Sequence, residues 1–530
     1  MRRWNGWGDD ATDYPLNDSA RAYLAQRLGP SSPLQDPALD DCLRQLPPSR
    51  LATETDLDTT AESRLRRAHG ESFPDWLARK TATMGPYPDA VARPVSLEEL
   101  QAVVARARDG GWQLIPYAGG TSVVGHLSVP AEAPPVLSVD LSGLAGLLEL
   151  DETARLARFG AGTPGPALEA ALGARGYRLG HFPQSWEYST VGGWVVTRSS
   201  GQQSLAYGRI EQLFAGGRMI CPAGELEIPC LPASSAGPDL RELVMGSEGR
   251  FGILGEAQMR VSPLPEREQF IALMLPDWER AEAAVRALAQ RRSGLSMLRL
   301  SNARETETQL RLAGHERGIA ALQKYLGLRG IGEGQCLLML GLSGSTAEVR
   351  HAWARARSVL RGQGAVRLGP WIGRAWEKNR FRGPYLRNSL WAAGFGADTI
   401  ETAVNWPQVT GLMRAMETAA EAAFAEDDEP VLAFSHLSHV YPQGCSIYAT
   451  FVFRAVADRD TMLARWQRFK ARVSEVVVAH GGTISHQHGV GTDHKPYLAA
   501  EKGERGLDLL RAVARELDPG GIMNPGKLFD

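Results

Sequence analysis

The sequence has little cysteine and no excess of either charge. Its 530 residues include five cysteines, an odd number, and no two of them form a Cys-x-x-Cys pair. A disulfide scaffold and a cysteine-rich zinc or iron–sulfur site are therefore not expected, and the cytoplasm is the simplest location. The 58 basic and 60 acidic residues give a net charge of -2. This balance argues against nucleic-acid binding, which needs an excess of Lys and Arg.

Long apolar runs are also missing. No stretch of about 18 apolar residues exists that could span a membrane. The basic start at residues 1–8 leads into polar residues, so we expect no signal peptide. Hydrophobic residues make up 43% and charged residues 22%, which is typical of a soluble globular protein. At about 150 residues per domain, the length predicts two to four domains.

Strand and helix signals alternate between residues 88 and 261. Ser96, followed by Glu98 and Glu99, predicts the start of a helix that runs to residue 108. Pro263 and Pro265 mark a linker to a second region with long Ala/Arg-rich helices. This second region predicts an α+β lobe with an antiparallel sheet. The expected strands are 90–94, 114–117, 136–141, 252–261, 336–342 and 446–453, and the other expected helices are 166–176, 281–292, 346–361 and 506–517.

Three glycine clusters are candidates for binding a phosphate-containing cofactor. The first, at 116–123, contains a Gly-Gly-Thr-Ser turn whose backbone N–H groups can form an anion-binding nest. The second covers 180–201 without helical or strand periodicity, and a loop of that length inside a domain is usually functional. The third, at 245–253, precedes the predicted strand 252–261.

In order and spacing, these clusters resemble the flavin-binding domain of the vanillyl-alcohol oxidase/p-cresol methylhydroxylase (PCMH) superfamily. The resemblance implies an α+β fold with a two-subdomain PCMH-type FAD-binding domain at 84–265. A helical N-terminal extension would cover 1–83, a substrate or cap domain 266–500, and a tail returning to the FAD domain 501–530. Covalent relatives carry a His where this chain has Thr121, so FAD is expected to be noncovalent. The residues implied to bind FAD are Pro116, Ala118, Gly119, Gly120, Thr121, Ser122, Pro183, Ser185, Ser189, Thr190, Gly192, Gly193, Thr197, Ser200, Gly201, Glu248, Gly252 and Ile253.

Within that superfamily the chain is most similar to the alkyldihydroxyacetonephosphate synthase (alkylglycerone-phosphate synthase) family. The similarity rests on Trp-Asn-Gly-Trp-Gly at 4–8, on 189–201, on Ile-Glu-Thr at 400–402 and on 485–491. It implies a transferase of ether lipid biosynthesis, which exchanges the acyl group of acyl-dihydroxyacetone phosphate for a fatty alcohol through a flavin N5 adduct. A membrane surface and a second copy in a homodimer are candidate partners beside the small-molecule substrate.

The same resemblance assigns roles in the second region. Tyr441 would take a proton from the reacting carbon, with its pKa lowered by neighbouring cations such as His486 and His488. Arg387 would bind the substrate phosphate as a bidentate guanidinium. The other arginines at 374–382 fit a phosphate site and a solvated helix face equally. Thr402 and His439 complete the implied substrate contacts.

Departures from the family leave two other interpretations open. Gln487 stands within the family's His-His-His, and Phe182 and Gln184 replace two carboxylates. An FAD-dependent 2-hydroxy-acid dehydrogenase or oxidase of the same fold is the first alternative. Its metal-binding histidines would have spacings like that of His486 and His488, although we expect no metal here. A binding scaffold without flavin is the second.

Overall fold

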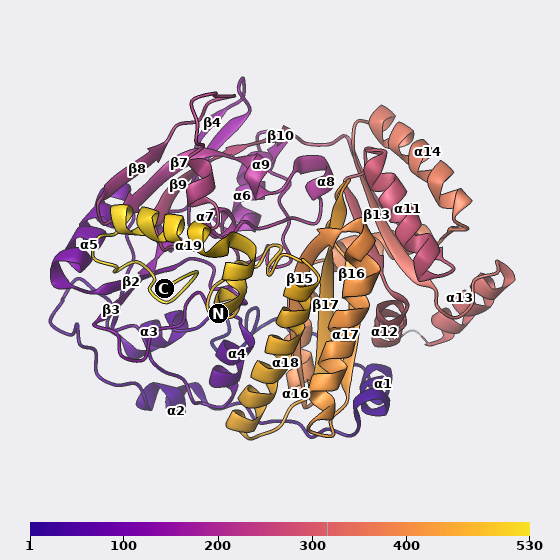
Figure 1. Cartoon of the computed structure of the whole chain (residues 1–530), viewed down its shortest axis with the longest axis horizontal. Helices are drawn as coiled ribbons and strands as arrows, with labels where there is room; N and C mark the ends of the chain where they lie inside the picture. The colour runs from indigo at the N-terminus through magenta and orange to yellow at the C-terminus, as the bar shows by residue number, and fades with distance from the viewer. Residues whose placement is uncertain (315) are drawn as a thin grey trace.

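The residues that the structure describes, 1–314 and 316–530, form three main β-sheets (Figure 1). This computed structural model divides into a first lobe with two of the sheets and a second lobe with the third. None of the helices in the described part of the chain has both the length and the apolar character needed to cross a membrane.

The first lobe combines a parallel and an antiparallel sheet. The parallel sheet has the order β1-β3-β2, and the antiparallel sheet has the order β4-β5-β9-β7-β8. Helix α5 (Leu97–Gly110) begins as predicted, because the Ser96 side chain accepts a hydrogen bond from the Glu99 N–H. The strands are β1 (Ala90–Ala92), β2 (Gln113–Tyr117), β3 (Val136–Asp140), β4 (Leu147–Asp151), β5 (Leu156–Gly160), β7 (Phe214–Cys221), β8 (Gly224–Ile228) and β9 (Ile253–Arg260). The helices are α6 (Gly165–Gly173), α7 (Val191–Val196), α8 (Ser204–Tyr207), α9 (Ile210–Leu213) and α10 (Arg241–Val244).

The second lobe is built on a seven-stranded antiparallel sheet of order β14-β11-β13-β12-β16-β17-β15. A short pair, β6 (Tyr177–Arg178) and β10 (Ser262–Pro263), lies at the junction with the first lobe. The seven strands are β11 (Arg267–Leu275), β12 (Met297–Ser301), β13 (Cys336–Gly344), β14 (Val366–Arg367), β15 (Phe395–Asn405), β16 (Val431–Leu437) and β17 (Gly444–Arg454). The helices are α11 (Trp278–Gln290), α12 (Ala303–Ala313), α13 (Glu316–Leu328), α14 (Thr346–Gly362), α15 (Pro370–Asn379), α16 (Leu386–Ala392), α17 (Val409–Ala425) and α18 (Arg459–Ala479).

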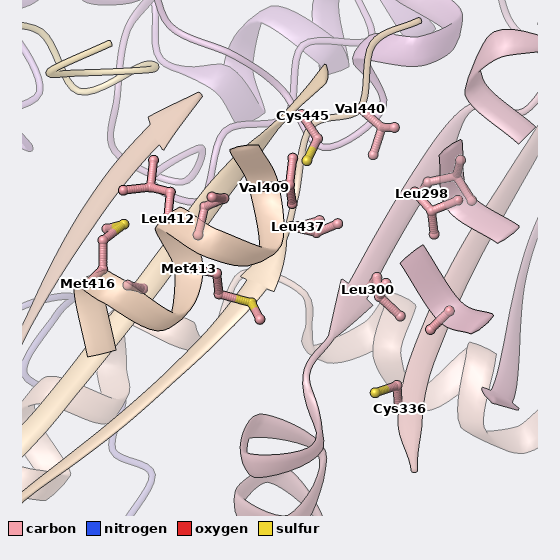
Figure 2. Close-up of a cluster of buried hydrophobic side chains, with 14 of the residues drawn as sticks. Leu298, Leu300, Cys336, Val409, Leu412, Met413, Met416, Leu437, Val440 and Cys445 are labelled. Carbon is pink, nitrogen blue, oxygen red and sulfur yellow. The ribbon is translucent and has the colours of Figure 1, made fainter. Parts of the chain in front are cut away.

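Alternation along the strands gives this sheet two different faces. Ile447, Ala449 and Phe451 of β17 are buried in the largest hydrophobic core, on the face that α17 and α18 cover. Figure 2 shows part of that core, where Val409, Leu412 and other α17 residues meet strand residues such as Leu437 and Cys445. The intervening residues, Tyr448, Thr450 and Val452, point to the opposite face and line a cavity.

Both ends of the chain cross between the lobes. Phe73 of α4 (Phe73–Lys80) belongs to the core of the second lobe and lies 5.6 Å from the Phe453 ring. Helix α19 (Leu498–Leu517) lies against the first lobe (Figure 1), where Leu507 and Phe529 join the core of the five-stranded sheet. The predicted boundary at residue 500 therefore falls inside the first turn of α19. The remaining N-terminal helices are α1 (Asp18–Leu28), α2 (Leu39–Arg44) and α3 (Ala61–Arg67).

The predicted fold class is confirmed: an α+β chain with two subdomains in the first lobe and an antiparallel sheet in the second.

Candidate active site

A cavity of about 640 Å³ lies where the two lobes meet. The first lobe lines it with backbone from the three glycine clusters, at 116–123, 183–200 and 248–254. The second lobe lines it with the open face of the seven-stranded sheet and with residues of α12, α15 and α16. The predicted cofactor side and the predicted substrate side thus share one cavity.

Most residues predicted to bind the cofactor reach this cavity. Glycines let the loops approach closely: a Cβ atom at Gly119 would lie 2.2 Å from the Tyr188 carbonyl oxygen, so only glycine fits between the first two clusters. Gly201 packs against the Phe182 backbone and does not line the cavity. The predicted residues that do line it are Pro116, Ala118, Gly119, Gly120, Thr121, Ser122, Pro183, Ser185, Ser189, Thr190, Gly192, Gly193, Thr197, Ser200, Glu248, Gly252 and Ile253.

Arg387 presents an unsatisfied cation to the cavity. Its Nη1 donates to the Glu71 carbonyl oxygen at 2.5 Å, and its guanidinium lies 4.8 Å from the centre of the Trp76 ring. Nη2 is buried without a hydrogen-bond partner. No carboxylate of the described residues lies within 4 Å of it. Because an unpaired buried guanidinium is costly, this geometry suits an incoming anion.

Glu401 is the hub of a buried polar centre beside the cavity. Its oxygens accept hydrogen bonds from Ser438 Oγ at 2.9 Å and from Gln487 Nε2 at 2.5 Å, and His486 Nδ1 lies 3.2 Å away. Burial alone would raise the pKa of Glu401, but the surrounding histidines hold that pKa well below its ordinary value. Sequence reasoning singled out Thr402 and missed Glu401, although both belong to the same motif.

The comparisons with known proteins agree with this architecture. The family of FAD linked oxidases, C-terminal domain, matches residues 264–528, and an FAD binding domain matches residues 88–228. The chain belongs to the FAD-linked oxidase family. It is therefore an enzyme, and FAD is its cofactor.

Relatives and solved structures extend over the whole chain. Alkyldihydroxyacetonephosphate synthase from Trypanosoma brucei brucei is 28% identical, covering 99% of this chain and 92% of that protein. The enzyme of that name from Caenorhabditis elegans is 29% identical, covering 100% and 95%. A solved structure of an alkyldihydroxyacetonephosphate synthase superposes with a TM-score of 0.84 at 24% identity, covering 99% of this chain and 98% of that one.

The cavity walls of this FAD-linked oxidase fit the cofactor. A long polar ligand needs hydrogen-bonding groups spread along its site, and buried polar atoms without a partner occur at separated points of the lining. Asn524 Oδ1 lies near the first and third glycine clusters, and Gln202 Oε1 lies beyond the second. Residues 116–123 and 183–200 would hold FAD through backbone and hydroxyl groups. The Glu248 carboxylate is already used by the Val490 and Gly491 N–H groups, so only its backbone remains for the cofactor.

Tyr441 does not reach the cavity, so its assignment as the base has no geometric support. Its hydroxyl lies 2.7 Å from His486 Nε2 and accepts a hydrogen bond from Arg209 at 2.9 Å. The ring lines a separate cavity of about 480 Å³ on the far side of this centre. The predicted lowering of its pKa is wrong, because burial outweighs Arg209 and raises the pKa of Tyr441.

Tyr448, which sequence reasoning did not select, lines the cavity where Tyr441 was expected. It lies on the cavity face of β17, with its ring stacked at 4.8 Å on His436. Burial raises its pKa to about 12, against the lowering effects of Thr399 and Arg387. The signal was available: in the strand predicted at 446–453, Tyr448 alternates with the apolar residues Ile447 and Ala449.

Thr402 and His486 also lie outside the cavity lining, whereas His439 and His488 line it. Strand alternation points Thr402 away from the cavity, where its hydroxyl donates to the Thr483 carbonyl oxygen at 2.7 Å. The His486 ring lies behind Glu401. The expected contact of Thr402 with the substrate is therefore wrong, because residue 402 faces the helical side of the sheet.

The atoms of Glu401, His439 and His486 come within 4.8 Å of one another, as a metal site would require. Arg209, however, donates to His486 Nε2 at 2.7 Å. Since an arginine can only donate, Nε2 must carry the lone pair and Nδ1 the proton that faces Glu401. This tautomer, with a cation beside it, opposes metal binding.

Proposed function

We propose that this enzyme exchanges the acyl group of acyl-dihydroxyacetone phosphate for a fatty alcohol, as an alkyldihydroxyacetonephosphate synthase. The observation that carries this proposal is one cavity that contains both Arg387, whose Nη2 has no hydrogen-bond partner among the described residues, and an apolar wall. Arg387 suits a phosphate, and the wall suits a hydrocarbon chain. The apolar lining residues include Met297, Leu312, Leu386, Leu390, Phe434 and Val452.

The reaction balances without net oxidation. The ester oxygen leaves carbon C1 with the acyl group as a fatty acid, and the alcohol oxygen forms the new bond to C1. FAD, when bound, supplies the reactive ring at which this replacement takes place. Arg387 holds the phosphate. Tyr448, a tyrosine on the second lobe's wall of the cavity, can take a proton from C1 and return one to C1 after the ether bond has formed, while the alcohol proton leaves with the fatty acid. Glu401, kept ionised, orients Ser438 and Gln487 at the edge of the cavity.

Gln487 fits this function despite its departure from the family pattern. It donates an N–H to Glu401, as a neutral imidazole would, and it does not need to titrate. The alternative, a 2-hydroxy-acid dehydrogenase, is less favoured because its small substrate leaves the apolar wall unused.

The purified enzyme should convert palmitoyl-dihydroxyacetone phosphate and hexadecanol into hexadecyl-dihydroxyacetone phosphate and palmitate, detected by mass spectrometry. Arg387→Lys keeps the charge but loses the bidentate fork, so KM for the phosphate substrate should rise by about 10-fold or more, corresponding to roughly 1–3 kcal/mol. Arg374→Lys on the exposed side of α15 is the matched control and should leave KM unchanged. Rapid flavin bleaching by a 2-hydroxy acid, without ether formation, would overturn the proposal.

A further inference from the structure

A second arginine, Arg380, also lines the cavity, and none of the described carboxylates pairs with it. We propose that Arg380 anchors a second anion subsite, which takes the carboxylate head of a fatty acid. The inference builds on the proposed function, where a fatty acid is the leaving product.

Three aromatic rings surround the Arg380 guanidinium. Its central carbon lies 4.6 Å from the ring centre of Phe182, 4.9 Å from that of Phe381 and 5.6 Å from that of Phe270. Cation–π contacts of this kind stabilise a buried guanidinium without neutralising its charge. Its one described side-chain hydrogen bond runs from Nη1 to Gln203 Oε1 at 3.3 Å.

Two other arginines, Arg178 and Arg299, are paired with carboxylates, whereas Arg380 has no such pair among the described residues. Arg178 pairs with Glu268 at 2.9 Å, and Arg299 pairs with Glu305 at 2.7 Å. Over residues 1–314 and 316–530, no carboxylate lies within 4 Å of Arg380. Burial lowers the pKa of Arg380, with Glu268 opposing, which reflects the cost of keeping this charge away from water. A bound anion would offset that cost.

The surroundings favour an anion with a hydrocarbon chain. Phe182 and Gln184 bring no charge to this end of the cavity, and Gln184 donates instead to the Arg380 carbonyl oxygen at 2.9 Å. Trp376, one turn earlier, lines the same cavity. A guanidinium edge matches the two oxygens of a carboxylate, and the apolar lining of the cavity, which includes Trp376, matches its alkyl chain. Phosphate already has Arg387, which approaches from α16.

The test compares an acid with an alcohol of the same chain length. Octanoate and octan-1-ol are titrated calorimetrically into the holoenzyme and into Arg380→Gln, which keeps a hydrogen-bonding side chain but removes the charge. We expect octanoate to bind about 10-fold or more weakly to the variant, the usual scale for a charge-assisted bond, and octan-1-ol to bind equally. Arg374→Gln, at an exposed position of α15, the helix that ends just before Arg380, is the matched control and should bind both ligands like the wild type.

Unchanged octanoate binding by Arg380→Gln would overturn the subsite. So would equal weakening of acid and alcohol, or loss of flavin, since these would assign Arg380 to packing or to the cofactor. Arg387→Gln should retain octanoate affinity. If this variant also lost octanoate affinity, Arg380 and Arg387 would belong to a single anion site. Because the titration needs no turnover, octanoate binding through Arg380 in an enzyme that forms no ether would reject the proposed reaction and keep the subsite.

Discussion

At the scale of single residues, two tyrosines seven positions apart have different locations: Tyr448 lines the cavity, and Tyr441 lies outside it. Tyr448→Phe deletes the hydroxyl on the cavity face and keeps the ring stacked on His436. Turnover should fall by about 10²–10⁴ with flavin content intact, which is the usual share of acid–base catalysis. Tyr441→Phe, the matched change outside the cavity, should cost less than 10-fold, on the order of one lost hydrogen bond. The reverse ranking of the two variants would restore Tyr441 as the base.

The pKa of Tyr448 adds a pH signature. With a pKa of about 12, the hydroxyl is protonated at neutral pH, and its deprotonated fraction grows tenfold per pH unit. If the phenolate takes the proton, log kcat should rise with a slope near one between pH 7 and 9, wherever the enzyme stays folded. A flat profile across that range would argue against a phenolate base.

Asp493 is a buried carboxyl that the proposed reaction does not use. Its Oδ2 has no hydrogen-bond partner, and burial, with Asp398 and Asp75 adding and Lys470 opposing, raises its pKa to about 6. A raised pKa in the folded state means that its contribution to stability is present below about pH 4 and lost as pH rises through 6. Asp493→Asn should therefore raise Tm by a few degrees at pH 8, on the order of 2 kcal/mol, and by little at pH 4. Equal Tm shifts at both pH values would show that the effect of Asp493 on stability does not depend on the protonation of its carboxyl group.

At the scale of elements, strand alternation explains both what could and what could not be predicted. The strand expected at 446–453 is β17 (Gly444–Arg454), and the helix expected at 346–361 is α14 (Thr346–Gly362). Their apolar periodicity is local and therefore readable from the sequence. The choice between Tyr441 and Tyr448, and between Glu401 and Thr402, depended on which face of a sheet meets the other lobe. Family motifs mark such segments, but they do not by themselves say which side chain points inward.

The tail after α19 is an element that single-sequence patterns barely indicate, yet it packs into the core of the first lobe. Phe529 lies 6.2 Å from the Phe251 ring, and Arg250 lies over it at 5.2 Å. Phe529→Ala should destabilise the first lobe by about 3 kcal/mol and lower the temperature of flavin release, because a buried aromatic side chain leaves a cavity. Leu509→Ala, on the exposed face of α19, is the control and should change neither value. An unaltered temperature of flavin release in the Phe529 variant would mean that the tail does not stabilise the flavin-binding lobe.

At the scale of the whole molecule, the cavity exists only while both lobes are in place. Glu248 of the first lobe accepts hydrogen bonds from Val490 and Gly491, which lie in the loop between α18 and α19. Asn524 of the tail donates to the Glu248 carbonyl oxygen at 2.7 Å. One residue thus connects the cofactor side, the histidine loop and the C-terminus. Sequence reasoning named Glu248 as a cofactor residue, but the two backbone N–H groups that donate to its carboxylate are 242 and 243 positions away and leave no local signal.

This arrangement predicts that FAD is held between the lobes without a covalent bond. Thr121 stands where covalent relatives have a histidine. The next histidine along the chain, His126, has Nδ1 2.7 Å from Ser122 Oγ and Nε2 2.9 Å from Glu248 Oε2, so both ring nitrogens already face protein groups. Acid unfolds both lobes and should release the cofactor, leaving the yellow colour in the supernatant and a colourless pellet. His126→Gln, run in parallel, should release FAD in the same way. A wild-type pellet that stays yellow would contradict the prediction, and a variant pellet that loses the colour would assign the bond to His126.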